Sequence, residues 1–493
     1  MNLERETKLA APPGFRLPDL GFDGLVSTPR EPQRLVTVYV DTPDLRIVRW
    51  GASLRHRRGE GWTVKLPRGT QGNALVRQEH VFEGDDARKL PSAACDLLRG
   101  FIRGAELGQV ARLQTRRAQV DLTDELGRPY AAVTDDEVSV MQGRRVASRF
   151  REVEVELAPG VPDDGLAPIV ERLRLAGAGP VDNVVKLVRA LGPRAEEPPD
   201  VVVPEVAKDA MLSEVVRRAL AVSVVRLLRH DAPVRLGEDP EAVHQARVAT
   251  RRLRSDLRTF RDALEPSWSA PLRDELRWLG DELGAVRDAE VLRDRLRTRV
   301  ELLDPNDQRA AEAVVERLSA ARDRARERLL SALTDRRYVA LLDDLVLATR
   351  EPGLLEEAAA LPARGAGRPM LEALWKHLET AAGRASDDAS DGLLHAARIR
   401  TKRMRYAAEA VLPVFGKRAS AFATAAADLQ DVLGEHQDSV VARSWLREAA
   451  SAGADPFVAG QLVALEARAA SDARDRWPAA WKALSRKRLR FWS

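Results

Sequence analysis

The stretch Glu4-Arg-Glu-Thr-Lys8, close to the start of the chain, places two acids and a base at alternate positions. If this stretch is a β-strand, side chains two residues apart share a face, so Glu4, Glu6 and Lys8 point the same way. Two carboxylates and an ammonium are costly to bury in a dry core. The face that carries them must therefore be hydrated or hold metal ions.

A second acidic strand is predicted over residues 151–157. There Glu152, Glu154 and Glu156 alternate with valines. Three carboxylates in a row at strand spacing repel one another unless a cation lies among them. Oxygen-only ligands of this kind suit Mg²⁺ or Mn²⁺ rather than zinc. Either acidic strand alone is typical of a solvated surface.

Basic side chains occupy the strands predicted between these two acidic ones: Arg55, Arg57, Lys65, Arg77 and Arg117. A closed barrel with acids on one wall and bases on another could hold a metal–triphosphate complex along its axis. Arginine and lysine would then bind the phosphate oxygens, and the carboxylates would hold divalent ions. The combination of both acidic strands with these bases favours a functional tunnel over two solvated faces.

The chain divides into a β-rich part and a helical part. About the first 190 residues alternate in polarity, with turn formers between the runs, as in an antiparallel meander. Residues 196–205 are rich in proline and acids and are predicted to form an extended linker. From there on, the pattern is that of long helices. We therefore predict an α+β protein with two domains, at residues 1–195 and 206–493.

The helical half contains an internal repeat. His244-Gln-Ala-Arg-Val-Ala-Thr-Arg-Arg-Leu-Arg254 matches His395-Ala-Ala-Arg-Ile-Arg-Thr-Lys-Arg-Met-Arg405, at an offset of 151 residues (395 − 244). A second match relates residues 279–284 and Asp288 to residues 429–434 and Asp438, at an offset of 150 (438 − 288). Two ordered matches predict two pseudo-symmetric helical bundles, at about residues 206–350 and 365–493.

Each repeat carries a basic helix face. On a helical wheel, an arc of about 80° holds five residues of the first copy, His244, Arg247, Arg251, Arg254 and Arg258. The equivalent arc of the second copy holds His395, Arg398, Lys402 and Arg405, and Glu409 replaces the fifth base. Like charges at this spacing destabilise an isolated helix by roughly 0.2–0.5 kcal/mol per pair. An anionic ligand is therefore indicated, and the regularly spaced charges of linear polyphosphate fit guanidinium forks.

Other polar residues of the helical half leave alternatives open. The histidines that lead the repeats lack a second His or Cys at i+3 or i+4, which disfavours zinc. Asp288, Asp438 and His436 either orient basic side chains across the bundle or cap helices after Gly284 and Gly434.

Residues 1–195 resemble the CYTH family of triphosphate tunnel metalloenzymes. The likeness rests on the Glu-x-Glu-x-Lys opening, Tyr39-Val-Asp-Thr-Pro-Asp44, Leu54-Arg-His-Arg57 and the late Glu-x-Glu-x-Glu strand. It implies an eight-stranded antiparallel tunnel barrel with flanking helices, and metal-dependent hydrolysis of inorganic triphosphate or a related triphosphate. Thr115 and Val185 depart from the usual pattern of the family, which bears on the exact substrate.

The resemblance also implies site residues. The implied catalytic residues are Glu4, Glu6 and Lys8. With the acidic strand included, the implied ligands of Mg²⁺ or Mn²⁺ are Glu4, Glu6, Asp135, Glu152, Glu154 and Glu156. The implied substrate-binding residues are Lys8, Arg55, Arg57, Lys65, Arg77, Arg117 and Lys186.

Residues 206–493 resemble the CHAD domain, a helical module named for its histidines. The repeated His-x-Ala-Arg-x-x-Thr-[Arg/Lys]-Arg-[Leu/Met]-Arg segment carries this likeness. It implies polyphosphate binding without chemistry of its own. The implied binding residues are His244, Arg247, Arg251, Arg254, Arg258, His395, Arg398, Lys402 and Arg405.

The composition narrows the function classes. The 493 residues include one cysteine, Cys95, which excludes an internal disulfide and a C-x-x-C metal or redox site. No signal peptide and no run of about 18 uncharged apolar residues is visible, which favours a cytoplasmic protein. No P-loop motif occurs. The net charge is +4, but the basic residues fall in clusters.

Several functions remain to be weighed. The first hypothesis is a metal-dependent triphosphatase that its helical domain recruits to polyphosphate. The alternative is a non-catalytic polyphosphate-binding protein, associated with polyphosphate granules. A nucleotide cyclase ranks lower because no adenine-specific feature is visible. A nucleic-acid binder also ranks lower, because aromatic residues make up only 5% of the chain and do not alternate with the basic faces.

Overall fold

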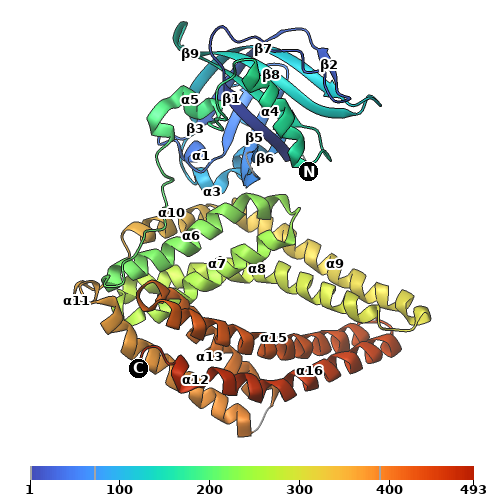
Figure 1. Cartoon of the computed structure of the whole chain (residues 1–493). Helices are drawn as coiled ribbons and strands as arrows, with labels where there is room; N and C mark the ends of the chain where they lie inside the picture. Colours follow the sequence, from blue (N-terminus) through green and yellow to red (C-terminus); the bar gives the residue numbers. More distant parts are fainter. Residues whose placement is uncertain (1–2, 72–73, 388–389) are drawn as a thin grey trace. The chain divides into compact units, whose positions relative to one another are not determined.

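The computed structural model describes residues 3–71, 74–387 and 390–493. The chain forms two compact units, Met1–Asp200 and Val201–Ser493, which are described separately (Figure 1). The segment predicted as a linker begins on the first unit. There, Asp200 accepts a hydrogen bond from Nε1 of Trp50 at 2.8 Å and pairs with Arg103, so the chain is held to the barrel up to this point.

The first unit is a closed antiparallel barrel. Eight strands follow one another in the order β7-β3-β4-β5-β6-β1-β9-β8, and a β7–β8 pairing closes the ring. Their bounds are β1 Leu3–Ala10, β3 Gln33–Asp41, β4 Ser53–Arg57, β5 Gly61–Gln71, β6 Ala74–Phe82, β7 Gly108–Thr123, β8 Pro129–Gln142 and β9 Arg145–Leu157. The short strand β2 (Val26–Pro29) pairs with β7 outside the ring. The predicted eight-stranded barrel is confirmed.

The strands of the barrel have an apolar outer face and a charged inner face. Outward-facing residues such as Leu9, Val133 and Val155 are buried under helix α4 (Leu166–Leu175). Since the side-chain period of a strand is two, their neighbours Lys8 and Glu154 point inward. The register places Lys8 opposite Glu154. The hydrophobic effect on the outer face therefore fixes the direction of the charged residues.

Helices α1 (Arg46–Arg49) and α5 (Lys186–Leu191) contribute to an apolar cluster at one part of the barrel, with Tyr39 and Leu113. The motif at residues 39–44 builds this region. The carboxylate of Asp41 accepts hydrogen bonds from the backbone amides of residues 42, 47 and 48, at 2.6–2.9 Å. Two short helices, α2 (Ser92–Leu97) and α3 (Arg99–Ile102), flank the barrel.

The second unit is helical and duplicated. Its long helices are α6 Leu212–Leu236, α7 Pro240–Thr259, α8 Pro266–Val300, α9 Pro305–Thr334, α10 Arg336–Arg350, α12 Ala363–Asp387, α13 Asp391–Ala410, α15 Lys417–Ser451 and α16 Pro456–Leu484. The short helices α11 (Glu356–Ala359) and α14 (Leu412–Phe415) lie in connections.

Four long helices of the first repeat correspond to four of the second. In the first copy α6 packs on α7, α7 on α8 and α8 on α9; in the second, α12 packs on α13, α13 on α15 and α15 on α16. The repeated segments α7 and α13 are each 20 residues long, and the following helices α8 and α15 each have 35. The two hairpins α8–α9 and α15–α16 share a core that includes Leu296, Val314, Leu446 and Leu462 (Figure 1).

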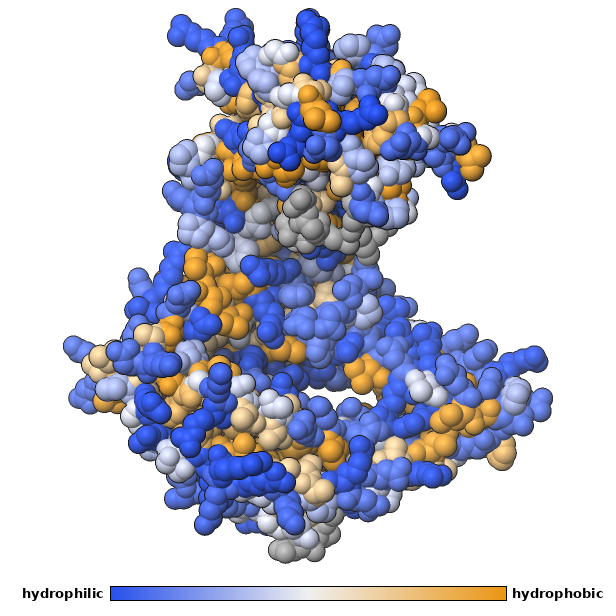
Figure 2. Space-filling view, in the orientation of Figure 1, coloured by the Kyte–Doolittle hydropathy of each residue, from blue (hydrophilic) through white to orange (hydrophobic). Residues whose placement is uncertain are grey.

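In the view of Figure 2, hydrophilic residues dominate the surface of the helices, and hydrophobic residues are scattered among them. Among the described residues, no helix combines the length and apolar character needed to cross a bilayer.

Candidate functional site

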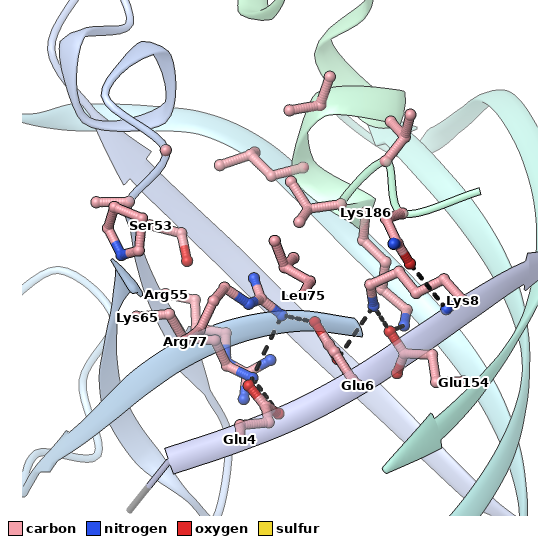
Figure 3. A pocket seen from close by; sticks show the side chains of 18 of the residues that line it. Glu4, Glu6, Lys8, Ser53, Arg55, Lys65, Leu75, Arg77, Glu154 and Lys186 are labelled. Atoms are coloured by element: carbon pink, nitrogen blue, oxygen red, sulfur yellow. Dashed lines mark hydrogen bonds and ion pairs between the residues drawn. The ribbon is translucent and has the colours of Figure 1, made fainter. Parts of the chain in front are cut away.

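The interior of the barrel holds a cavity of about 550 Å³. Its lining includes most of the residues predicted for the tunnel: Glu4, Glu6, Lys8, Arg55, Arg57, Lys65, Arg77, Arg117, Glu154, Glu156 and Lys186. Figure 3 shows the side chains of β1 directed toward Arg77 on one side and toward Glu154 on the other. Charges that are far apart in the sequence therefore converge in one cavity.

Lys8 lies at the centre of one charged group. Its Nζ is 3.3 Å from Glu6 and 3.7 Å from Glu152, and it also pairs with Glu154. The side chain is only 2% exposed. Burial lowers the pKa of Lys8 to about 8, although Glu6 opposes this shift. Burial also opposes the ionisation of Glu6, but Lys8 and Arg77 hold its pKa far below the usual range.

A second charged group covers the neighbouring wall. Nζ of Lys65 lies 2.6 and 2.7 Å from the two carboxylate oxygens of Glu4. Arg77 pairs with Glu6, and its guanidinium is 3.7 Å from Glu4. Burial lowers the pKa of Lys65, and the cations Arg55 and Arg77 lower it further. Because these cations repel one another, an additional anion beside them would be stabilising.

A third group joins α5 to the barrel. Nζ of Lys186 lies 2.8 Å from both Glu152 and Glu154 and 3.0 Å from Asp136. Asp136 also accepts hydrogen bonds from Arg117 at 2.7 and 2.9 Å. Burial alone would raise the pKa of Asp136, but Lys186 and Arg117 hold it well below its usual range.

The structure corrects the prediction for Asp135. Its carboxylate accepts two hydrogen bonds from Arg151, at 2.6 and 2.8 Å, on the opposite face of β8 from the tunnel. The next residue, Asp136, points inward instead, since it pairs in register with Arg117. Two adjacent aspartates on one strand must face opposite ways, and the sequence alone does not show which one faces inward.

This correction leads to a test of the barrel interior. Because Asp136 is fully buried against two cations, Asp136→Asn should lower the free energy of unfolding by about 2–4 kcal/mol. The neighbouring change Asp135→Asn weakens the contact with one cation, Arg151, instead of two, and should lower the free energy of unfolding by less. Urea denaturation of the two full-length variants measures the difference. Equal midpoints would contradict the placement of the two carboxylates.

Glu156 is a tunnel carboxylate that lies close to other carboxylates. It lies directly opposite Glu6 in the β1–β9 register and is exposed to the cavity. Burial in the barrel raises the pKa of Glu156 to about 7, and the Glu4 carboxylate contributes to this shift. In the described parts of the chain it makes no ion pair. Like charges facing each other at strand spacing would be relieved by a bound cation.

The donor set of the tunnel suits Mg²⁺ or Mn²⁺, because Glu4, Glu6 and Glu156 offer only carboxylate oxygens. Within residues 3–71, 74–387 and 390–493, no three acidic, His or Cys side chains are already arranged around one point as metal ligands. The ion pairs explain this arrangement: Glu4 and Glu6 are turned toward Lys65 and Arg77.

A second candidate site lies in the helical unit, where α7, α8, α13 and α15 border a groove of about 360 Å³. Its polar lining comprises His244, Arg247, Arg251, Arg287, Asp288, Arg295, Arg398, Lys402, Gln437 and Asp438. The basic faces of both repeats therefore meet in one groove. Arg287 and Arg295 were not predicted, because they lie on α8, outside the repeated basic segments of α7 and α13.

Only part of the basic lining of this groove is neutralised by acids. Arg247 pairs with Asp288 at 2.6 Å, so this aspartate orients a basic side chain, which was one of the two alternatives. Among the described residues, Arg251, Arg398 and Lys402 have no carboxylate within ion-pair distance. Burial lowers the pKa of Lys402 to about 7, and the cations Arg398, Arg251 and Arg247 contribute to this shift.

Some of the residues predicted to bind polyphosphate or to orient its basic partners do not line the groove. Nε of Arg405 donates to Glu409 at 2.9 Å, and Glu409 also pairs with Arg252. His395 lies outside the groove lining, with Nδ1 2.6 Å from the side-chain oxygen of Gln437. His436 is buried against Asp391, at 3.1 Å, so it does not orient the groove cations. Arg254 and Arg258 lie further along α7.

Comparison with known proteins agrees with this organisation. Residues 218–447 match the family model of the CHAD domain. The chain is 32% identical over 503 residues to the uncharacterized protein Rv2226 of Mycobacterium tuberculosis (strain H37Rv). The aligned region covers 94% of this chain and 93% of that protein. No activity is attached to that name.

Two solved structures are also similar. The CHAD domain from the plant Ricinus communis is 32% identical, with a TM-score of 0.47, and covers 58% of this chain and 96% of that one. PptA from Streptomyces chartreusis is 24% identical, with a TM-score of 0.47, and covers 55% of this chain and 100% of that one. A closed barrel with a charged interior, followed by a CHAD domain, defines a two-domain tunnel protein. The chain belongs to the CYTH–CHAD family.

Proposed function

We propose that the barrel hydrolyses inorganic triphosphate or a related triphosphate with Mg²⁺ or Mn²⁺, and that the helical unit binds polyphosphate. The observation that carries the first part is the cavity in which basic and acidic walls face each other. An interior of this kind is costly in a dry core and is useful only with a polar, multiply charged ligand.

The ion pairs of the tunnel suggest how the substrate binds. Phosphate oxygens can replace the carboxylates as partners of Lys65, Arg77 and Arg55, because arginine and lysine form strong charge-assisted hydrogen bonds with phosphate. Glu4 and Glu6, without these basic partners, would together with Glu156 be the residues that hold the divalent ion.

Hydrolysis forms a bond between a water oxygen and the terminal phosphorus and breaks the bond to the bridging oxygen. The divalent ion supplies positive charge at the phosphate oxygens. The chain's own residues bind and orient the phosphates, and positioning together with electrostatic stabilisation provides most of the rate enhancement in this class of reaction. Lys8 and Lys186, both buried, fix the acidic wall opposite the substrate.

The pseudo-symmetry of the helical groove supports polyphosphate as its ligand. Equivalent arginine-bearing helices, α7 and α13, approach the same groove. A linear polyphosphate is the same when read from either end, whereas a nucleic-acid strand has a direction. No Phe, Tyr or Trp occurs among the described residues that line the groove, so bases would lack the large aromatic rings on which they usually stack.

A phosphate-release assay tests the proposed hydrolysis. Tripolyphosphate, ATP and thiamine triphosphate are compared in Mg²⁺, in Mn²⁺ and in EDTA. Release from tripolyphosphate that requires the divalent ion supports the proposal. Absence of release together with tight polyphosphate binding would favour the non-catalytic alternative, and formation of cyclic AMP from ATP would favour a cyclase.

The affinity for polyphosphate should depend on pH through Lys402. A bound polyanion raises the pKa of this lysine above its ligand-free value of about 7, so binding takes up a proton. The contribution of protonated Lys402 is fully present below pH 7 and is lost as the pH rises through the higher pKa of the complex. We expect the affinity to fall about tenfold between pH 7 and pH 8.5.

Titration calorimetry at several pH values measures this dependence. Lys402→Arg should flatten it, because an arginine side chain keeps its charge over this pH range; the equivalent position of the first repeat is an arginine, Arg251. In the ligand-free groove, burial and next Arg287 lower the pKa of His244 from its usual value. An unchanged pH profile in Lys402→Arg would show that another group takes up the proton.

A further inference from the structure

The cations of the tunnel lining stop before one end of the barrel. Arg55, Lys65 and Arg77 face inward from the neighbouring strands β4, β5 and β6. One inward position further along the same strands, the lining residues carry no charge: Ser53, Pro67 and Leu75. Because neighbouring strands are antiparallel, all three steps lead toward the same end of the barrel. In the view of Figure 3, Ser53 and Leu75 lie above Glu4.

Two helices complete this uncharged end of the cavity. Helix α1 lies just before the start of β4, and Val48 of α1 packs with Leu187 of α5 in one apolar cluster, so α5 lies at the same end. The segment that includes α5 also contributes Val184, Val185 and Val188 to the cavity lining. Val48 and Leu187 are buried in the cluster, and packing within the fold accounts for them.

Packing does not account for the other aliphatic side chains of this end. Val184 is 37% exposed, and Leu75 and Val188 are half-buried, although all three line the cavity. Aliphatic surface that stays in contact with water is unfavourable, and an apolar group bound beside it would remove that contact. A cavity of about 550 Å³ is also in the range that encloses small organic ligands.

Two features of the uncharged end narrow the choice of ligand. Among the described residues of the lining, the aromatic one, Tyr39, is only 5% exposed and packs in the apolar cluster, so it offers no open ring face to a base. The acid Glu196, which follows α5, also lines the cavity and would repel a further phosphate. An aliphatic group fits this end better than a base or a longer phosphate chain does.

We propose that the tunnel accepts triphosphate monoesters of aliphatic alcohols and binds their alkyl group at the uncharged end, against Leu75, Val184 and Val188. This inference rests on the proposed triphosphate hydrolysis and names a substrate class for the same site. The phosphate next to the alkyl group then lies beside Arg55, and the terminal phosphate lies toward Arg57, two residues further along β4. Water attacks the terminal phosphorus and the bond to the bridging oxygen breaks. The products are orthophosphate, the alkyl diphosphate and a proton released to solvent.

The test compares methyl, butyl and hexyl triphosphate with tripolyphosphate in full-length protein whose helical groove carries Arg251→Glu/Arg398→Glu. Calorimetry without a divalent ion measures binding without turnover, and phosphate release in Mg²⁺ measures hydrolysis. In this background, the tunnel variant Leu75→Asn/Val184→Thr makes the uncharged end polar with little change in side-chain volume and none in charge.

The matched control, Val81→Thr/Leu126→Asn, makes the same two kinds of change at exposed positions of the barrel, outside the described lining of the cavity. A methylene group that leaves water raises affinity about fourfold, so hexyl triphosphate should bind the background protein at least about 100-fold more tightly than methyl triphosphate. The tunnel variant should lower this ratio at least about tenfold, with less than about a twofold change for tripolyphosphate. The control should leave the ratio unchanged. The values of kcat/KM for phosphate release should follow the same order.

The outcomes separate this inference from the proposed function. If hexyl triphosphate binds no more tightly than methyl triphosphate while tripolyphosphate is bound and hydrolysed, the tunnel reads only phosphates and the inference fails. It also fails if the control lowers the ratio as much as the tunnel variant does, since the alkyl chain then binds elsewhere. If the background protein neither binds nor hydrolyses any triphosphate, the proposed function itself fails. Retained binding of tripolyphosphate by the tunnel variant shows that this variant is folded.

Discussion

Replacing both tunnel carboxylates of β1, in Glu4→Gln/Glu6→Gln, is expected to reduce the kcat for phosphate release from tripolyphosphate at least about 100-fold. Removal of one preorganised electrostatic group from an active site typically costs a factor of about 10²–10³. Here the two changes remove two of the three carboxylates of the tunnel's donor set and leave only Glu156. The amides keep the shape of the side chains but cannot neutralise a divalent ion.

The measurement is steady-state phosphate release over a range of Mg²⁺ and Mn²⁺ concentrations. If the carboxylates hold the ion, a Glu6→Gln single variant should need a higher metal concentration to reach half of its maximal rate. The control is Asp135→Asn, the same acid-to-amide change on the outer face of the barrel, which should leave kcat unchanged. Metal-dependent release at the original rate in the double variant would place the reaction elsewhere.

Lys65 and Arg77 lose their carboxylate partners in this double variant, so stability must be followed as well. A buried charge that loses its partner can cost about 3–5 kcal/mol. Thermal unfolding therefore accompanies the kinetics. A variant that unfolds at the original temperature and has lost its activity assigns the loss to the chemistry rather than to the fold.

The charged walls of the tunnel could be predicted because the period of a strand is fixed. Once the valines of residues 151–157 are assigned to a core, the glutamates between them must face the other way. The structure places Val153 and Val155 in that core and the glutamates toward Lys8 and Lys186. No knowledge of the neighbouring strands was needed.

The aspartate pair of β8 shows where this reasoning ends. Which of two adjacent residues faces inward depends on the register between strands, and here that register places Asp136 opposite Arg117. The sequence could have suggested this pair only if the register of β7 and β8 had been known. Asp136 was missed for this reason, although it contacts two predicted phosphate-binding residues.

The helical unit shows a similar limit. That the bases of α7 share one helix face could be predicted, since residues at i, i+3 and i+4 share a face whatever lies nearby. Whether a given base is available for a ligand depends on its neighbours. Arg405 is held by Glu409, one turn away, while Arg295 of α8 reaches the groove and pairs with Glu435 and Glu466 on two other helices. Such contacts between helices are not visible in a single helical pattern.

Both candidate sites share one electrostatic arrangement. In the tunnel and in the groove, cationic side chains are crowded together, and this crowding contributes to lowering the pKa values of Lys65 and Lys402. A phosphate ligand relieves this repulsion. The free energy that the cations cost the ligand-free protein therefore adds to the affinity for phosphate. Competition by monovalent salt should therefore weaken binding at both sites.

Charge reversal in the groove, by Arg251→Glu/Arg398→Glu, is expected to reduce polyphosphate affinity at least about 100-fold. Each lost contact between a charged donor and phosphate costs about 1.5–3 kcal/mol, and two new carboxylates add repulsion. Both arginines line the groove and lack ion pairs in the described part of the chain, so their replacement breaks no internal salt bridge. The repulsion around Lys402 should fall as well, and its pKa should rise.

Fluorescence anisotropy with end-labelled long-chain polyphosphate measures this affinity in the full-length protein. A matched reversal at exposed positions of α9, Arg324→Glu/Arg328→Glu, changes the net charge equally and should weaken binding only slightly. Phosphate release from tripolyphosphate in the barrel should be retained by both variants, since neither alters the tunnel lining. Equal losses of affinity in the two reversals would mean that polyphosphate responds to overall charge, and that the groove between the repeats is not its site.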